Sequence, residues 1–350
     1  MRTLDALWAL EREWRGLSAA GRMRNPFLTW EWVSSWMECF SGSNRPNVVM
    51  VRGPGGELVG IAPLVRRTRR YRGVPVRELA FVGTGPAAPD HLDVLCMDGA
   101  EEDVAGAVLG HLRGGRYGFD LLTLRGAAAG SPLVSRLLAA VPPDHRVTTE
   151  EPCPYVRLPS TWDEYLAGRS IEFAKNLRRR RRRLAEDHPS ATCRRVDEPQ
   201  ALDAAMDDLV RLHSSRFTGP DGGAFADPGL ERFHRMVARR FLAQGWLRLY
   251  MLEVDGRPIA VRYGFAHGGV FWAYITGYDQ TFARYSPSTQ LNAHAIGEAI
   301  AEGLHEFDFL QGDEQYKAEW TSDRRHDVNV TVPARAGLRA LVSARKRVRR

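Results

Sequence analysis

The sequence predicts an α/β (α+β) fold made of two tandem units, each a mostly antiparallel mixed sheet flanked by helices. Three observations lead to this prediction. The order of elements in the first half recurs in the second, a proline-rich segment separates the halves, and 350 residues are enough for two units. With 44% hydrophobic and 26% charged residues, the composition is that of a folded globular chain.

The recurring order begins with a β-hairpin in each half. Residues 47–67 and 246–265 both read as strand, tight turn and strand, and Asp255-Gly256 forms the turn of the second. Later in each half, at 100–126 and 286–312, a helical stretch leads through a glycine to a strand containing Phe-Asp. The pattern indicates two related units, with chance similarity of short segments as the alternative.

The segment between the halves, residues 141–160, contains five prolines and suits a linker. We place the boundary at Leu158, which gives domains 1–158 and 159–335 and a basic tail, 336–350. One helix is expected from Thr161, a suitable N-cap, to the region of Pro189. Its apolar stripe is Phe173, Leu177 and Leu184, and arginines 178–183 cover the rest. A second helix is expected over 201–217.

The charge balance suits an anionic partner such as a phosphate, coenzyme A or RNA. The net charge is +7, but 46 of the 49 basic residues are arginine, so the codon bias of a GC-rich genome is the favoured source of the excess. No apolar run is long enough to span a bilayer and no signal peptide is evident, so we expect a cytoplasmic protein. The four cysteines are far apart and indicate buried thiols, with no disulfide framework and no metal site.

The second-half helix that opens near Ser286 is a candidate phosphate site. Ser286 suits an N-cap and Pro287 suits the first helical position. A helix start after a strand directs free N–H groups and a positive dipole end outward, which favours an anion. The equivalent first-half helix opens with three acids, 101–103, which repel phosphate. An ordinary capped helix is the alternative. The candidate cofactor-binding residues are Arg284, Tyr285, Ser286, Ser288, Thr289 and Gln290.

These segments resemble a known family. The runs TGYDQTFARYSPSTQL and GLHEFDFLQGDEQYKAEW, with NPFLTWEWVSSW, LVGIAPL, DHLDVL and AKNLRRRRRRL, are similar to the cellulose-biosynthesis (CelD-like) acetyltransferases of the GNAT superfamily. The resemblance covers about Asn25 to Trp320 and implies tandem GNAT-like domains, distantly related to the Fem peptidyltransferases. It implies a degenerate, acceptor-side first domain and an acyltransferase second domain.

The resemblance also implies the co-substrate. In GNAT enzymes the pyrophosphate of coenzyme A sits at a glycine-rich helix start, which matches 284–290 here. This sequence departs from that pattern, because Ser286, Ser288 and Thr289 replace glycines. Because glycines would allow the closest backbone approach, this departure counts against coenzyme A. Acyl-CoA is still the donor that the resemblance implies, aminoacyl-tRNA is the alternative, and no permanently bound cofactor is expected. Fem enzymes with a coiled-coil arm place two long helices between their repeats, and only one short helix is expected here between Thr161 and Pro189.

The family pattern Gly-Asp-Glu-x-Tyr-Lys matches residues 312–317, after the last expected strand of the second half. Transfer of an acyl group to an amine needs a base, an acid for the leaving group and oxyanion stabilisation. Asp313 or Glu314 would take the amine proton, Tyr316 would protonate the leaving group, and Lys317 would steady the oxyanion or a phosphate. The simpler alternative is that Asp313 caps the next helix and Lys317 pairs with a surface acid.

Two further clusters are candidate acceptor-binding sites. One is Asp90, His91 and Asp93 of the first half, for which a hydrogen-bonded turn is the alternative. The other is Trp272, Tyr274 and Tyr278, which alternate along one expected strand and should share one face of the sheet. His294 is expected to be structural.

Three functional hypotheses follow. The first is an N-acyltransferase that uses acyl-CoA and an amine of an amino sugar, amino acid or small metabolite. The second keeps the fold and takes aminoacyl-tRNA as donor. The third is a non-catalytic GNAT-fold accessory protein of polysaccharide synthesis. A DNA-binding regulator is disfavoured because no helix-turn-helix or zinc motif is present. Acceptor, acyl length and oligomeric state stay open.

Overall fold

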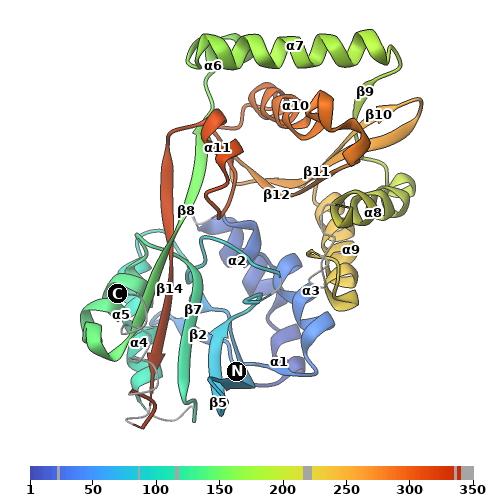
Figure 1. Ribbon diagram of the computed structural model, residues 1–350. Helices are drawn as coiled ribbons and strands as arrows, with labels where there is room; N and C mark the ends of the chain where they lie inside the picture. Colours follow the sequence, from blue (N-terminus) through green and yellow to red (C-terminus); the bar gives the residue numbers. More distant parts are fainter. Residues whose placement is uncertain (22–23, 86, 115–117, 216–222, 335–336, 340–350) are drawn as a thin grey trace. The chain divides into compact units, whose positions relative to one another are not determined.

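The computed structural model describes residues 1–21, 24–85, 87–114, 118–215, 223–334 and 337–339. The chain forms two compact units (Figure 1): Met1–Pro152 together with the segment from Arg325 onward, and Cys153–Arg324. The chain leaves the first unit within β8 (Val147–Arg157) and returns to it in β14 (Arg324–Pro333). Most of the predicted basic tail, 336–350, lies outside the described residues.

The first unit contains a main sheet, a smaller sheet and five α-helices among its described residues. The main sheet has the order β1-β4-β5-β7-β14-β8, and the smaller one β2-β3-β6. The strands are β1 (Asn44–Pro46), β2 (Val49–Arg52), β3 (Leu58–Ala62), β4 (Leu64–Tyr71), β5 (Val74–Phe81), β6 (Leu95–Cys96) and β7 (Leu121–Ala128). The helices are α1 (Leu4–Trp8), α2 (Glu11–Ala20), α3 (Trp30–Phe40), α4 (Glu101–Arg113) and α5 (Pro132–Ala140), with short 3-10 turns η1 (Pro26–Leu28) and η2 (Pro143–His145).

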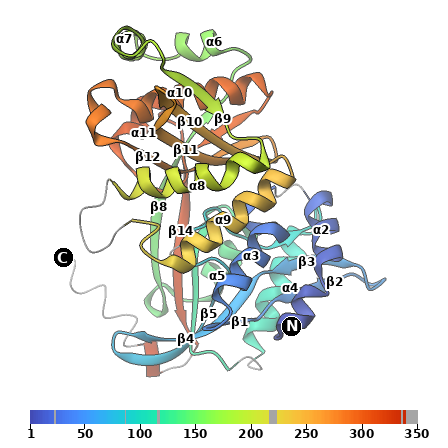
Figure 2. The same cartoon turned by 90° about the vertical axis from the view of Figure 1, so that its right-hand side faces the viewer.

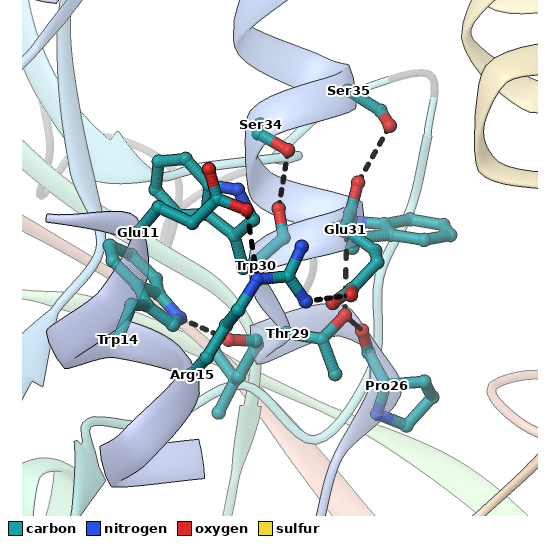
Figure 3. Close-up of polar contacts among 11 residues, drawn as sticks. Glu11, Trp14, Arg15, Pro26, Thr29, Trp30, Glu31, Ser34 and Ser35 are labelled. Carbon is teal, nitrogen blue, oxygen red and sulfur yellow. Dashed lines mark hydrogen bonds and ion pairs between the residues drawn. The ribbon is translucent and has the colours of Figure 1, made fainter. Parts of the chain in front are cut away.

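Helices α2 and α3 are joined by buried polar contacts (Figure 3). The indole N–H of Trp14 donates to the carbonyl of Leu28 at 2.9 Å, and Arg15 forms an ion pair with the buried carboxylate of Glu31. Thr29 caps α3, and its hydroxyl donates to the carbonyl of Pro26 at 2.7 Å. These contacts explain the polar residues within the otherwise apolar run NPFLTWEWVSSW, so this motif is structural.

The second unit has one sheet, of order β8-β13-β12-β11-β10-β9, with helices on both faces. The strands are β9 (Thr192–Arg195), β10 (Leu247–Val254), β11 (Arg257–His267), β12 (Val270–Tyr278) and β13 (Glu306–Asp308). The helices are α6 (Trp162–Ala167), α7 (Ile171–Asp187), α8 (Pro199–Ser214), α9 (Pro228–Ala243), α10 (Pro287–Ala301) and α11 (Gln315–Trp320), with a 3-10 turn η3 (Gln280–Tyr285). Helices α8 and α9 cover one face, and α10 covers the other with α7 beyond it (Figure 1).

The structure confirms the predicted fold class. Most strand pairs are antiparallel, and each unit adds one parallel pair across a helical connection: β5 with β7 around α4, and β12 with β13 around α10. The turn at Asp255-Gly256 has positive φ at both residues, as a two-residue hairpin requires. The hairpin expected at 47–67 also forms, as β2 and β3, but it lies in the smaller sheet, and β4–β5 is the hairpin of the main one.

The single helix expected from Thr161 is instead two helices. Thr161 and Glu164 form a reciprocal capping box at the start of α6, as the sequence suggested. However, α6 ends at Gly168, and Ser170 caps a new helix, α7, by accepting the amide of Phe173 at 3.1 Å. The break occurs because Gly168 and Ser170 supply a stop and a second start within three residues. Leu177 and Leu184 lie on the buried stripe of α7, and Phe173 packs against the same core.

Two other sequence expectations concern membrane-spanning segments and the burial of the cysteines. In the part of the chain that the structure covers, no helix has the length and apolarity to cross a membrane. All four cysteines are free thiols, but only Cys96 and Cys153 are fully buried, whereas Cys39 and Cys193 are half-exposed. Burial raises the pKa of the Cys96 thiol to about 12.

Candidate active site at the open edge of the second sheet

The sheet of the second unit opens between β12 and β13. The two parallel strands pair only from Val270 to Trp272 opposite Glu306 to Asp308. Beyond Asp308 the chain follows β8 instead, since the amide of Phe309 donates to the carbonyl of Pro154 at 3.0 Å. The remainder of β12 therefore has no β13 residue opposite it. Because parallel strands end at the same edge, the segments that follow β12 and β13 both begin at this opening.

Helix α10 starts at this edge, but not in the way the sequence suggested. Pro287 is the first helical residue, as predicted. Ser286 is not a side-chain N-cap: it is in the left-handed conformation (φ 51°, ψ 58°), and its hydroxyl makes no capping bond. The 3-10 turn η3 separates β12 from α10, and Ser286 is the residue between this turn and the helix. The carbonyl of Ser286 accepts the amides of Thr289 and Gln290 at 3.0 and 3.2 Å.

The other residues of segment 284–290 are divided between core and surface. Tyr285 is buried, and its hydroxyl donates to Asp187 of α7 at 2.7 Å, so this side chain belongs to the core and not to a phosphate site. Arg284 stacks on the Tyr285 ring at 4.7 Å and lies 3.7 Å from the same carboxylate. The side-chain amide of Gln290 donates to the carbonyl of Tyr285 at 2.9 Å.

Thr289 lines an open cavity of about 480 Å³. The rest of the lining comes from the junction of α6 and α7, from α7 and from α11. It consists of Gly168, Arg169, Ser170, Glu172, Phe173, Asn176, Leu177, Arg180, Ala318, Glu319 and Ser322. Next to Thr289, the Ser288 hydroxyl oxygen is buried and has no hydrogen-bond partner among the described residues. The cavity therefore joins the predicted phosphate segment to α11, the helix that contains the last three residues of the Gly-Asp-Glu-x-Tyr-Lys motif.

Two arginines give this cavity a positive wall. Arg169 is held in place, because it donates to the carbonyl of Trp320 at 2.8 Å and lies over the Tyr165 ring at 5.4 Å. Arg180 has no acidic partner within 4 Å among the described residues, so its guanidinium is available to a ligand. Of the two acids on the lining, Glu172 already accepts the amide of Asn176 at 2.8 Å. The sequence reasoning treated 178–183 as one basic face and missed Arg169, Asn176 and the separate position of Arg180.

Lys317 fastens the loop that follows β13. It is 3% exposed, and its ammonium lies 3.2 and 2.8 Å from the carbonyls of Leu310 and Gln311 and 2.9 Å from the carboxylate of Glu314. A side chain at Gly312 (φ +124°) would collide with this ion pair. Lys317 is therefore fully engaged within the protein, and the expected oxyanion role does not fit its contacts. The ion pair with Glu314, whose side chain is more than half exposed, matches the simpler alternative that Lys317 pairs with a surface acid.

The other residues of the motif are more accessible. Asp313 is exposed and lies 3.6 Å from Arg324, and it does not cap α11, which begins after Glu314. Glu314 is also more than half exposed at its side chain. Tyr316 is half-buried, with its ring 6.4 Å from that of Phe309. Asp313, Glu314 and Tyr316 thus lie close to the carboxyl end of β13, where a reacting group in the sheet opening would be found.

The three aromatic residues of β12 do not share one face, so that expectation is wrong. Tyr263 pairs with Ile275 and Gly264 pairs with Ala273, which leaves Tyr274 as the extra residue of a β-bulge. Tyr274 lies on the α9 side, 5.2 Å from the His234 ring, whereas Tyr278 packs against the core beneath α10. The bulge shifts the alternation by one residue. Trp272, before the bulge, donates its indole N–H to the carbonyl of His267 at 3.1 Å.

The first-unit cluster is a fastened turn. Asn25 donates to the carbonyls of Asp90 and His91 at 2.9 Å each, and Asp327 accepts the amide of His91 at 2.7 Å and faces its Nδ1 at 2.8 Å. All of these groups are buried. Burial raises the pKa of the Asp93 carboxyl to about 6, against hydrogen bonds from Ser131 and the amide of Val94 that lower it. These contacts match the hydrogen-bonded turn that was the alternative for this motif.

His294 is on α10, edge-on to the Tyr250 ring at 5.2 Å. Burial lowers its pKa. Two residues earlier, Asn292 is buried and binds Arg262 of β11, a contact that ties α10 to the centre of the sheet. The sequence signal for that pair was the polar residue at 292 within an otherwise apolar helix face.

Comparison with known proteins defines the class of this domain. Residues 172–318 match the family model described as acetyltransferase (GNAT) domain. The chain thus carries a GNAT-type domain that covers α7, α10, the open sheet edge and most of α11. No curated protein matches the chain.

Solved structures agree on the fold over nearly the whole chain. FemX is similar with a TM-score of 0.64 at 11% identity, over 95% of this chain and 98% of FemX. The C-terminal domain of a putative lysylphosphatidylglycerol synthetase from Agrobacterium fabrum gives 0.57 at 12% identity, over 97% and 96%. A conserved protein of unknown function from Bacteroides thetaiotaomicron gives 0.55 at 13% identity, over 92% and 97%. At these identities the likeness shows the fold alone, and the family match adds the class, a GNAT-fold acyltransferase.

Proposed function

We propose that this protein is an N-acyltransferase that binds acyl-CoA in the cavity beside the start of α10 and transfers the acyl group to an amine. The observation that carries the proposal is the position of Arg180. It is a guanidinium without an acidic partner in the described chain, in one cavity with Thr289 of the first turn of α10. A cation beside a helix N-terminus suits a pyrophosphate.

The sheet opening gives the acyl group a place next to this cavity. Backbone N–H groups of β12 beyond Trp272 that face the opening have no β13 partner, and such donors suit a thioester oxygen as it becomes an oxyanion. Asp313 or Glu314 would accept the amine proton, directly or through water, and Tyr316 would protonate the leaving thiolate. Lys317 has a positioning role, because it holds the loop that presents these side chains.

A thiol-release assay tests this proposal. Acetyl-CoA and longer acyl-CoAs are offered with amino sugars, amino acids and small amines, and free coenzyme A is measured. Asp313→Asn or Glu314→Gln should lower kcat by about 10²- to 10⁴-fold, the usual range for a lost general base. Glu186→Gln, an exposed residue of α7, is the control. If every donor–acceptor pair is inert, or if neither Asp313→Asn nor Glu314→Gln lowers kcat more than Glu186→Gln does, the proposal fails.

The acceptor class follows from the sequence resemblance. The motifs shared with CelD-like acetyltransferases favour an amine of a surface-polymer or secondary-metabolite pathway, and we keep this family assignment as part of the proposal. The acceptor-binding roles first considered for Asp90, His91 and Asp93 are not retained, since hydrogen bonds within the first unit already occupy this turn. Trp272 and Tyr274 stay candidates beside the opening.

Aminoacyl-tRNA is the second candidate donor, and helix α7 favours it. Arg178, Arg179, Arg181 and Arg183 are exposed and have no acidic partner within 4 Å in the described chain, whereas Arg182 pairs with Glu186 at 3.5 Å. The fold shared with FemX is consistent with this donor. Retention of labelled tRNA on a filter, with a steep decrease as salt increases, would support it. Activity in a lysate-supplemented assay that RNase leaves unchanged would exclude it.

A further inference from the structure

A second cavity lies between α7 and α10. It is larger than the cavity beside the start of α10 that is lined by Thr289 and Arg180, which we call the donor cavity. Its volume is about 690 Å³, within the range of small-molecule sites. Figure 2 shows α7 end-on above α10, with α6 beside it. The lining residues are Trp162, Asp163, Leu166, Leu177, Arg178, Arg181, Leu184, Ala185, Ala191, Thr192, Cys193, Leu252, Gln290, Ala293, His294, Gly297 and Glu298. We call this cavity the α7–α10 groove.

The lining of the groove has an apolar part, which we call its floor, and two arginines, Arg178 and Arg181. Leu166, Leu184, Leu252 and Ala293 come from four different elements and form the apolar part of the lining, in which Leu184 and Leu252 are buried and Leu166 and Ala293 half-buried. Arg178 and Arg181 also line the groove, and in the described part of the chain neither has a carboxylate oxygen within 4 Å. The groove thus offers burial to a hydrocarbon chain and unpaired charge to an anion.

Helical geometry separates the groove from the donor cavity. Leu177 lines both cavities, because it is on the buried stripe of α7. At 100° per residue, Arg180 lies on one side of Leu177, and Arg178 and Arg181 lie on the other. A ligand in the groove therefore uses different arginines from an acyl-CoA in the other cavity.

The charge of Arg181 acts inside the groove. It lowers the pKa of two groups on the lining, the Cys193 thiol and the His294 imidazole, although burial is the larger effect on each. Burial raises the pKa of Cys193 to about 11. Glu298 opposes Arg181 at both groups, and Asp163 is the other acid on the lining. Neither acid forms an ion pair with the arginines.

We infer that the α7–α10 groove binds an anionic amphiphile, with its hydrocarbon chain on the apolar floor and its phosphate or carboxylate head at Arg178 and Arg181. This goes beyond the proposed transfer from acyl-CoA, whose cavity is lined by Arg180 and not by Arg178 or Arg181. With aminoacyl-tRNA as donor, the tRNA phosphates would compete for Arg178 and Arg181. Arginine suits such a head group because its planar fork donates two parallel hydrogen bonds to a carboxylate or phosphate. A hydrocarbon chain in the groove would also cover the half-buried side chains of Trp162, Leu166 and Ala293.

Cys193 allows a direct test with the full-length protein. Its alkylation by N-ethylmaleimide is followed by peptide mass spectrometry with dodecyl phosphate below its micelle concentration. Cys39, the other half-exposed thiol, is the internal control. We expect dodecyl phosphate to slow alkylation of Cys193 and not of Cys39, and inorganic phosphate and dodecanol to protect weakly or not at all. Absence of protection at all soluble concentrations of dodecyl phosphate, in folded protein, would overturn the inference.

Two double variants on α7 distinguish binding at a defined head-group site from non-specific attraction to the positive charge of the helix. The double variant R178Q/R181Q should bind dodecyl phosphate at least about tenfold more weakly, the effect of one lost charge-assisted hydrogen bond. R179Q/R183Q removes the same charge from outside the groove and should bind as the parent does. Equal loss in both pairs would contradict a defined head-group site. Protection by phosphatidylglycerol vesicles but not by monomeric dodecyl phosphate would show a membrane-facing surface instead and would also contradict it.

Discussion

Lys317 shows how a motif residue can be recognised from the sequence while its contacts are not. An ammonium has three donors, and here they are directed at backbone carbonyls of residues 310–312 and at Glu314, all within one short loop. The sequence marks Lys317 because lysine is rare in this chain and because it ends a family motif. It does not show that the loop turns back over the lysine, which needs the positive φ of Leu310 and Gly312.

Replacement of Lys317 by Met should lower the free energy of unfolding by about 2 kcal/mol, because buried carbonyls lose their charge-assisted donor. Lys317→Arg should also destabilise, since a planar guanidinium does not match a site built for a compact ammonium. Urea denaturation measures both, and the exposed Lys175→Met should change stability by less than about 0.5 kcal/mol. Unchanged stability with lost turnover would assign Lys317 to the substrate instead.

Asp93 predicts a pH dependence of stability. Its pKa is raised to about 6 by burial, so between pH 4 and 6 the folded protein binds more protons at this carboxyl than the unfolded chain does. Its contribution to stability therefore falls as pH rises through this window, by an amount on the order of 3 kcal/mol. Asp93→Asn removes the titration and keeps an acceptor for the amide of Val94. Relative to the parent, this variant should become more stable as pH increases from 4 to 7.

Urea denaturation at several pH values checks the Asp93 prediction. Asp103→Asn, an exposed residue of α4, should give a profile parallel to the parent's within about 0.5 kcal/mol. A parallel profile for Asp93→Asn would mean that the carboxyl has an ordinary environment in the folded protein.

At the scale of elements, the starts of α6 and α10 show which structural features can be predicted from local sequence and which cannot. The capping box of Thr161 and Glu164 was readable because both partners lie within one turn. The start of α10 was not readable, because a 3-10 turn precedes it and Ser286 is in the left-handed region, and the sequence Ser-Pro-Ser gives no sign of either feature. The Tyr274 bulge was hidden for a similar reason, since it depends on the register with β11.

These two helix starts should respond differently to mutation. Thr161→Ala should lose about 1 kcal/mol of stability because it removes a capping bond. Ser286→Ala should change stability by less than about 0.5 kcal/mol, since no such bond exists there. Ser286→Gly should gain about 0.5 kcal/mol, because glycine adopts positive φ without strain. Thermal and urea unfolding measure all three, and a loss for Ser286→Ala equal to that for Thr161→Ala would contradict the observed start of α10.

At the scale of the whole molecule, the fold was more predictable than the site. Short-range signals such as Asp255-Gly256 and the alternation of strand residues were enough for the α/β class, and family motifs supplied the GNAT type. The cavity beside α10 was not predictable, because Arg169, Arg180, Thr289 and Glu319 are brought together only by tertiary packing. Arg180 also looked like its neighbours, since a run of six arginines does not reveal which one faces a cavity.

The central claim is that the cavity beside α10 binds an acyl-CoA donor, and calorimetric titration with acetyl-CoA and longer acyl-CoAs tests it most directly. We expect saturable heat with at least one of them and about tenfold weaker binding in Arg180→Gln, the effect of one charge-assisted contact. Arg183→Gln, on the exposed side of α7, should bind as the parent does. Absence of heat with every acyl-CoA in folded protein, or equal weakening in both variants, would contradict the claim.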